Sequence, residues 1–245
     1  MADRSFEAVA EHFTQKIYGS LKGQIRLKVL KSDLAQFTQL SDLAVLDIGC
    51  GSAQIGLWLA GFGHHVELCD LSASLLSQAS AACPKDSDVS FTQGAYQDLK
   101  TANQSLDLIL SHAVLEWLDD PKAMIDFALA KLKTGGHLSL CFYNPASYQY
   151  RNLIMGNFYQ LDRPAKLDAK TLTPNNPVSL EQALDWTQGF TVVSQSGIRV
   201  FHDYSPLKRG GHTNPEAVLD KELEFSQQEP FWRMGRYLHL LLKKR

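Results

Sequence analysis

Two acidic residues and two glycines in the first third of the chain have the types and spacing of a nucleotide-binding site. Asp47 lies at the end of an apolar segment and begins the pattern D-x-G-x-G with Gly49 and Gly51. Glycines let the backbone turn sharply beside a ligand, and a helix after such a turn offers its N-terminal N–H groups. A second apolar segment ends in Asp70, 19 residues after Gly51, where a carboxylate can accept hydrogen bonds from both hydroxyls of a ribose. The pattern predicts a site for a nucleoside cofactor.

The glycine spacing distinguishes two kinds of cofactor. A dinucleotide-binding turn has the pattern G-x-G-x-x-G, and Gln54 stands where the third glycine is expected. Asp47 also favours a ligand with a positive ammonium or sulfonium group over a ligand with two phosphates. The residues therefore favour S-adenosylmethionine and a methyltransferase, while a nicotinamide-dependent reductase stays open as a weaker alternative.

Composition points to one soluble domain. The 245 residues are 44% hydrophobic and 20% charged, which is ordinary for a globular protein that buries a full core. No apolar run reaches the ~18 residues of a membrane span, and the N-terminus lacks the pattern of a signal peptide, so we expect a cytoplasmic protein. The cysteines lack metal-ligand spacing, and we expect them to be free, buried thiols without a structural metal. They are Cys50, Cys69, Cys83 and Cys141.

Charge is distributed unevenly along the chain. Residues 33–145 hold 5 Lys or Arg and 13 Asp or Glu, whereas residues 1–32 hold 6 and 3, and residues 146–245 hold 13 and 10. The centre is therefore acidic and both flanks are basic, which favours an anionic substrate handled by the flanks. The alternative is that these basic residues only cover solvated helices.

Hydrophobic periodicity predicts a doubly wound, Rossmann-like α/β fold with a mostly parallel sheet of seven strands. Resemblance to S-adenosylmethionine-dependent methyltransferases implies an antiparallel last strand. Residues 1–40 are predicted to form two helices that cover the cofactor, and residues 41–144 form the cofactor-binding core. Within the core the expected strands are 43–48, 65–69, 88–93, 106–111 and 136–143, and the expected helices are 53–61, 72–82 and 121–133.

The regular alternation stops after residue 144. Residues 145–178 contain four prolines and several aromatic and basic residues, and we interpret them as a helical insertion that forms a substrate lid. Residues 179–245 close the sheet, so that residues 1–245 form one domain. Here the expected helices are 180–186 and 215–225, and the expected strands, an antiparallel hairpin-like edge, are 190–195 and 237–242.

The residues after the expected strand 106–111 indicate which kind of group accepts the methyl. Residues 111–117 carry neither the Asn/Asp-Pro-Pro-aromatic turn typical of amine methylation nor a cysteine nucleophile for carbon methylation. A carboxylate needs neither device because it is ionised at neutral pH. It needs a cationic or hydrogen-bonding clamp, which Arg199 and His202 could provide. The alternative is that Arg199 pairs with a surface carboxylate.

Eight short segments resemble the bacterial tRNA 5-carboxymethoxyuridine methyltransferases, class I enzymes that use S-adenosylmethionine. The resemblance extends from about Arg4 to His239 and implies a carboxyl O-methyltransferase that esterifies 5-carboxymethoxyuridine at the wobble position of tRNA. It also implies the tRNA anticodon stem-loop as the partner. The segments are 17–19 (IYG), 22–26 (KGQIR), 69–72 (CDLS), 112–117 (HAVLEW), 156–158 (GNF), 197–204 (GIRVFHDY), 228–230 (QEP) and 235–237 (GRY).

The resemblance also implies a set of cofactor contacts. Arg26 is expected to pair with the methionine carboxylate. Ala53 stands where many such enzymes have glycine, and this costs little if the backbone there is already helical. Together with Gly51 of the glycine turn, the expected cofactor residues are Arg26, Gly49, Cys50, Asp70, Tyr96, Gln97 and His112.

The substrate side is inferred from chemistry alone. Its candidate residues are Tyr143, Tyr150, Arg199 and His202. Two other functions stay open. One is a methyltransferase for a small molecule, such as a quinone precursor or a free carboxylic acid, and the other is a tRNA-binding module that holds the cofactor without turnover.

Overall fold

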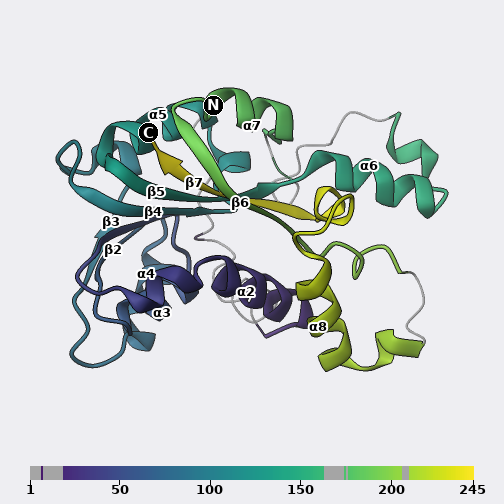
Figure 1. The fold of residues 1–245 in the computed structure, drawn as a ribbon, viewed down its shortest axis with the longest axis horizontal. Coiled ribbons are helices and arrows are strands. Elements are labelled where there is room, and N and C mark those ends of the chain that lie inside the picture. Colours follow the sequence, from purple (N-terminus) through teal and green to yellow (C-terminus); the bar gives the residue numbers. More distant parts are fainter. Residues whose placement is uncertain (1–6, 8–18, 163–173, 175, 206–209) are drawn as a thin grey trace.

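The computed structural model describes residues 7, 19–162, 174, 176–205 and 210–245. In this part of the chain seven strands form one sheet with helices on both faces (Figure 1). The sheet order is β3-β2-β1-β4-β5-β7-β6. The strands are β1 (Ala44–Ile48), β2 (His65–Asp70), β3 (Val89–Gln93), β4 (Leu106–His112), β5 (Leu132–Tyr143), β6 (Phe190–Ile198) and β7 (Tyr237–Lys244).

The strand directions confirm the predicted fold class. Strands β1 to β5 are parallel, and β7 runs antiparallel to both of its neighbours, β5 and β6. The predicted antiparallel pair at the edge of the sheet is confirmed, with β6 as the edge strand and β7 between β5 and β6. Strand β5 begins four residues earlier than predicted, because buried Leu132 pairs with Leu106 of β4.

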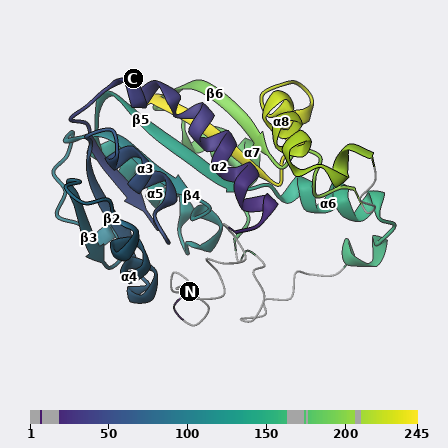
Figure 2. The same cartoon turned by 90° about the horizontal axis from the view of Figure 1, so that it is seen from below.

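The helices separate into two layers. Helices α2, α3, α4 and α8 lie on one face of the sheet, and α5 and α7 lie on the other (Figures 1 and 2). The predicted starts of the helices at residues 72 and 121 agree with the structure, where the side chains of Ser72 and Asp120 cap α4 and α5 by accepting a hydrogen bond from the first turn. The bounds are α2 (Leu21–Asp33), α3 (Gln54–Ala60), α4 (Ala73–Ala82), α5 (Pro121–Lys131), α6 (Pro145–Ile154), α7 (Leu180–Trp186) and α8 (Pro215–Phe225).

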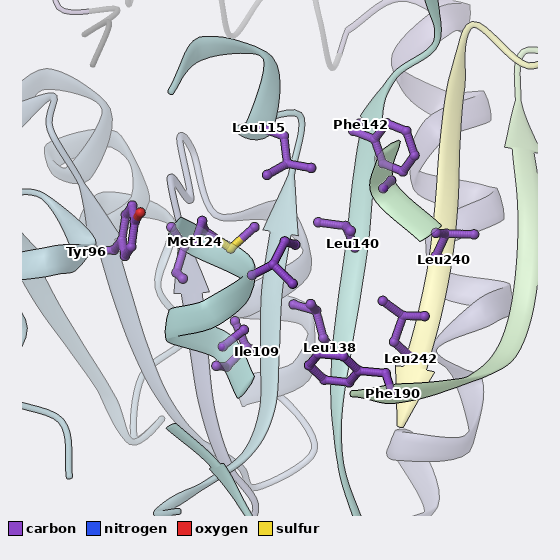
Figure 3. Close-up of a cluster of buried hydrophobic side chains, with 14 of the residues drawn as sticks. Tyr96, Ile109, Leu115, Met124, Leu138, Leu140, Phe142, Phe190, Leu240 and Leu242 are labelled. Carbon is purple, nitrogen blue, oxygen red and sulfur yellow. The ribbon is translucent and has the colours of Figure 1, made fainter. Parts of the chain in front are cut away.

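Each layer encloses its own part of the hydrophobic core. Between the sheet and α5, Ile109, Leu138 and Met124 are fully buried (Figure 3). On the opposite face, Val29 and Leu30 of α2 pack with residues of β1, β4 and β7. This packing fixes the carboxyl ends of β1, β2 and β4, from which the loops of the candidate site extend.

The segments outside the regular sheet are described in part. Helix α2 supplies one of the two predicted N-terminal helices, and the other falls in residues 8–18, outside the described residues. Helix α6 follows β5 as predicted and leads to the short helix η5 (Phe158–Gln160). Residues 163–173 and 175 of the predicted lid lie outside the described residues.

Three of the four cysteines are buried, and none of them forms a disulfide. The prediction of buried thiols is wrong for Cys83, which is half-buried because it follows the end of α4 at the surface. Within the described ranges, no helix has the length and apolar character needed to cross a membrane. The same ranges contain no group of three His, Cys, Asp or Glu side chains arranged to hold a metal ion.

Candidate cofactor and substrate site

A cavity opens at the carboxyl ends of β1, β2 and β4, bordered by α2. It contains about 1090 Å³ of empty space, which includes the open solvent at its mouth. Its lining residues come from the glycine turn, from the ends of the three strands, from the segments after β2, β3 and β4, and from helices α2, α3 and α4. They are Arg26, Leu27, Leu30, Asp47, Ile48, Gly49, Cys50, Gly51, Gln54, Ile55, Cys69, Asp70, Leu71, Leu75, Gly94, Ala95, Tyr96, His112, Ala113, Val114, Trp117 and Leu118.

The two glycines of the turn have different roles. Gly49 and Gly51 both adopt a left-handed backbone, with φ of 60° and 56°, which favours glycine. A Cβ at Gly49 would lie 2.7 Å from Cγ2 of Val114, whereas no neighbouring atom lies within 4 Å of a Cβ at Gly51. Gly49 therefore permits close packing within the protein, and Gly51 leaves open space where a ligand can approach the backbone.

Asp70 is held in a defined orientation at the end of β2. Its Oδ2 accepts a hydrogen bond of 2.8 Å from the backbone N–H of Gly51, and its Oδ1 accepts one of 2.8 Å from that of Ser72. Burial raises the pKa of Asp70, and these backbone bonds oppose the increase. Each oxygen can accept a further bond, so the fixed carboxylate fits the two hydroxyls of a ribose.

Asp47 places a second carboxyl group against the same cavity. Burial, together with the charge of Asp70, raises the pKa of Asp47 to about 8. An isolated negative charge is therefore unfavourable there, and a positively charged ligand would compensate for it. This environment fits the ammonium and sulfonium groups of S-adenosylmethionine and does not fit a pyrophosphate.

Ala53 differs from the expectation. We expected a helical backbone at this position, but Ala53 has φ of 54° and ψ of 33° and is the left-handed N-cap of α3. The condition under which alanine would cost little is therefore not met, and an L-residue there is strained by roughly 1 kcal/mol. The tertiary structure overrides the local preference because buried Ala53 must direct the chain from the glycine turn into α3.

Arg26 lies at the end of the cavity formed by α2. Its guanidinium Cζ is 4.2 Å from the centre of the Tyr237 ring, within the range of a cation–π contact. Burial raises the pKa of Glu116 to about 7, and the positive charge of Arg26 opposes this increase. His112 is neutral here because burial lowers its pKa, as do the nearby His239 and Arg26. This end of the cavity is therefore positively charged, which suits a carboxylate.

Seven of the eight expected cofactor residues line this single cavity: Arg26, Gly49, Cys50, Gly51, Asp70, Tyr96 and His112. The eighth, Gln97, is an exposed residue of the short helix η3 (Tyr96–Asp98) and is not among the lining residues.

None of the four expected substrate residues lines the cavity. Tyr143 ends β5, and its register partner Tyr237 begins β7. Both therefore lie at the end of the sheet where the cavity opens. The Tyr237 ring also lies near Arg199, at 5.4 Å from the guanidinium Cζ, and Arg236 lies 4.8 Å above the Tyr143 ring. These side chains form a cationic and aromatic cluster that continues from Arg26.

A buried glutamate supports the loop that carries Arg199. The carboxylate of Glu222 on α8 accepts hydrogen bonds from the backbone N–H groups of Val200, Phe201 and His202 at 2.7 to 3.2 Å. Arg199 itself has a φ of 63°, a strained conformation for a non-glycine residue. Such strain persists only where the surrounding structure enforces it, so α8 fixes the direction in which Arg199 leaves the sheet.

The remaining two candidates are less closely tied to the cavity. Tyr150 of α6 is 42% exposed and contacts Tyr204 edge-to-face at 5.3 Å. His202 is half-buried, and its Nδ1 has no hydrogen-bond partner among the described residues. Tyr150 is thus a surface group, whereas His202 lies in the loop supported by Glu222.

Sequence reasoning missed several residues of the site. Tyr237 and Arg236 were noted only as part of the GRY segment, although an arginine and a tyrosine at the start of a strand are a usable signal. Trp117, Leu71 and Leu75 line the cavity as apolar walls. They carry no chemical signature in the sequence, because an apolar residue after a strand is as common in a core as in a pocket.

Comparisons with known proteins identify the family of this chain. Residues 46–140 match a family described as a methyltransferase domain. The chain is 37% identical to the tRNA 5-carboxymethoxyuridine methyltransferase of Escherichia coli strain K12 over 255 residues, covering 100% of this chain and 97% of that protein. It is 28% identical over 187 residues to the ubiquinone biosynthesis O-methyltransferase of Coxiella burnetii, covering 75% of each.

A solved S-adenosylmethionine-dependent methyltransferase from Thermotoga maritima has the same fold, with a TM-score of 0.66, 16% identity and 98% of each chain covered. The full-length similarity to the Escherichia coli protein goes further than the fold, because it includes the N-terminal and C-terminal segments outside the domain match. The chain therefore belongs to the tRNA 5-carboxymethoxyuridine methyltransferase family.

Proposed function

We propose that this protein transfers the methyl group of S-adenosylmethionine to the carboxylate of 5-carboxymethoxyuridine at the wobble position of tRNA, and that it acts in the cytoplasm. The full-length similarity to the Escherichia coli enzyme carries the proposal. The cavity supports it, since its acidic turn and its cationic end match the two ends of the cofactor.

The cofactor half of the reaction depends on groups that bind and orient. Asp70 would accept hydrogen bonds from the ribose hydroxyls, Tyr96 would border the adenine, and Arg26 would pair with the methionine carboxylate. Bound S-adenosylmethionine supplies a methyl group on positively charged sulfur, which an oxygen nucleophile can attack. Asp47 favours that positive charge at the bottom of the cavity.

The acceptor half requires no general base. A carboxylate is ionised at neutral pH, so the protein must orient it, keep it near the methyl group and exclude water. Arg199 and Arg236 can hold the oxygen that does not react, because each guanidinium carries a positive charge and N–H donors. Both lie against aromatic rings. Tyr143 and Tyr237 supply those rings and exclude water beside them.

The tRNA would be gripped by the parts of the chain added to the core. Both flanks carry excess positive charge, which suits phosphates. Helix α6 and η5 expose aromatic side chains, among them Tyr150, Phe158 and Tyr159, and such rings can stack on an unpaired base. We propose that this surface binds the anticodon stem-loop and places the modified uridine at the cluster around Tyr237.

The decisive experiment is methyl transfer in vitro with tRNA from cells that lack this protein. Nucleoside mass spectrometry should show the free acid before incubation and its methyl ester afterwards, whereas the Asp70→Ala variant should leave the acid unchanged. Activity should fall steeply with ionic strength, since phosphate contacts release counterions. Transfer to a quinone precursor or a free carboxylic acid but not to tRNA would contradict the proposal, and so would cofactor binding without any transfer.

A further inference from the structure

A row of polar side chains crosses the face of the sheet that α2 covers. His112 of β4 and His239 of β7 both lie beside Ser139 of β5, with the Nε2 atom of each ring 2.8 Å from the Ser139 Oγ. The Nδ1 of His239 in turn lies 2.6 Å from the Oδ2 of Asp33, the last residue of α2. The four side chains form one continuous hydrogen-bonded chain that ends at a residue lining the cofactor cavity.

This series of hydrogen bonds is buried, and Asp33 fixes which group donates at its first bond. Ser139 and His239 are 0% exposed. The other carboxylate oxygen of Asp33, Oδ1, accepts hydrogen bonds from Ser196 Oγ at 2.9 Å and from Gln227 Nε2 at 2.8 Å. An ionised carboxylate only accepts hydrogen bonds, so the Nδ1 of His239 must carry the proton that it shares with Asp33.

The position of this proton determines the direction of the next hydrogen bonds, at Ser139 and His112. Ser139 has a single hydroxyl proton and lies between two Nε2 atoms. With the shared proton on its Nδ1, the ring of His239 offers Nε2 as an acceptor for the Ser139 hydroxyl proton. The Ser139 oxygen then accepts a hydrogen bond from the Nε2–H of His112.

We propose that Asp33, His239 and Ser139 are positioning residues that hold His112 as its Nε2–H tautomer, with Nδ1 as the acceptor nitrogen offered to the cofactor. The proposal rests on the cofactor half of the proposed function and not on the identity of the methyl acceptor. Asp33 and Arg26 belong to the same helix, α2, so the bond from His239 to Asp33 also ties that helix to the sheet. Asp33 thus ties the helix that carries Arg26 to the sheet and also sets the tautomer of His112.

The sharpest variant is Ser139→Ala, which removes the atom that joins the two rings. Its matched control is Ser111→Ala, since Ser111 is also fully buried, stands next to His112 on β4, and has a hydroxyl with no hydrogen-bond partner among the described residues. Calorimetry should show the Kd for S-adenosylmethionine raised about tenfold in Ser139→Ala, the loss expected for one orienting hydrogen bond. The Kd of Ser111→Ala should equal that of the parent.

NMR of the ¹⁵N-histidine-labelled protein, without cofactor or tRNA, measures which ring nitrogen of His112 carries the proton. His112, assigned with a His112→Asn variant, should show a protonated Nε2 and a bare Nδ1 at neutral pH, and Ser139→Ala should lose this preference. A protonated Nδ1 in the parent, or an unchanged tautomer and Kd in Ser139→Ala, would overturn the proposal. The spectrum of the parent tests it even if Ser139→Ala does not fold, and a failure to methylate tRNA would leave both measurements interpretable.

Discussion

The backbone N–H of Gly51 donates a hydrogen bond of 2.8 Å to Oδ2 of Asp70, and this bond ties the glycine turn after β1 to the end of β2. Asp70→Ala removes it together with the expected acceptor for the ribose. We expect cofactor binding to weaken at least about tenfold, as for the loss of a charged hydrogen-bond partner. Calorimetric titration with S-adenosylmethionine measures the change.

A matched control for this variant is Asp126→Ala, which removes an exposed carboxylate from α5 that pairs only with Lys122 in the described contacts. It should bind the cofactor like the parent. Equal affinities for Asp70→Ala and Asp126→Ala would exclude Asp70 from the cofactor site.

The two glycines of the turn should respond differently to alanine. Gly49→Ala combines left-handed backbone strain with a contact at 2.7 Å to Val114, and we expect a loss of about 2–4 kcal/mol in the free energy of unfolding. Gly51→Ala carries the backbone strain alone, about 1–2 kcal/mol, but places a methyl group beside the cavity. Urea denaturation should therefore rank Gly49→Ala as less stable than Gly51→Ala.

Cofactor titration completes this comparison. Gly51→Ala should bind S-adenosylmethionine poorly at a temperature where it is fully folded. Parent-like affinity in this variant would show that the open space beside Gly51 is not occupied by the cofactor.

Cofactor binding should release a proton from Asp47. Because the pKa of Asp47 is raised to about 8, its carboxyl is mostly protonated at pH 7 in the free protein, and a bound cation favours the ionised form. Affinity should therefore increase as the pH rises toward 8 and level off above it. Calorimetry at pH 7 in two buffers of different ionisation enthalpy should report about one proton released per cofactor.

Asp47→Asn is the control for that release, because it keeps the size of the side chain and removes the titrating group. The variant should show a flatter dependence of affinity on pH. A release of protons as large as that of the parent would assign the proton to another group.

The part of the site that sequence reasoning located is the part built from local chemistry. Gly49, Gly51 and Asp70 could be predicted because a turn and a strand end carry their function within a few residues. Tyr237 was missed, because it reaches the site only through the antiparallel pairing of β7 with β5, which brings it beside Tyr143. Sequence periodicity does not specify that strand order.

The backbone conformation of individual site residues could not be predicted from the sequence either. The left-handed Ala53 contradicts its local propensity, since the packing of the glycine turn against α3 decides its φ. Arg199 was expected from its chemistry, but the device that directs it is the carboxylate of Glu222, from another helix. A buried glutamate on a predicted helix gives no sequence signal for that role.

Arg199 provides the test that separates substrate binding from cofactor binding. Its guanidinium Cζ lies 5.4 Å from the centre of the Tyr237 ring, and Arg199 does not line the cavity, whereas Arg26 does. Arg199→Ala should therefore leave the Kd for S-adenosylmethionine unchanged within about twofold, yet lower kcat/KM on undermodified tRNA at least about tenfold, as for a lost charge-assisted bond. Asp203, its ion-pair partner at 3.5 Å, keeps Lys22 at 3.7 Å, so this variant leaves no isolated charge.

Two further variants make the result specific. Arg199→Lys keeps the charge but loses the planar fork that holds a carboxylate at two points, and its activity should lie between those of the parent and Arg199→Ala. Lys122→Ala removes an exposed cation of the acidic centre, on α5, that pairs with Asp126, and it should be as active as the parent. If Arg199→Ala and Lys122→Ala methylate tRNA equally well, the clamp on the substrate carboxylate must be assigned to Arg236, the other cation of the cluster.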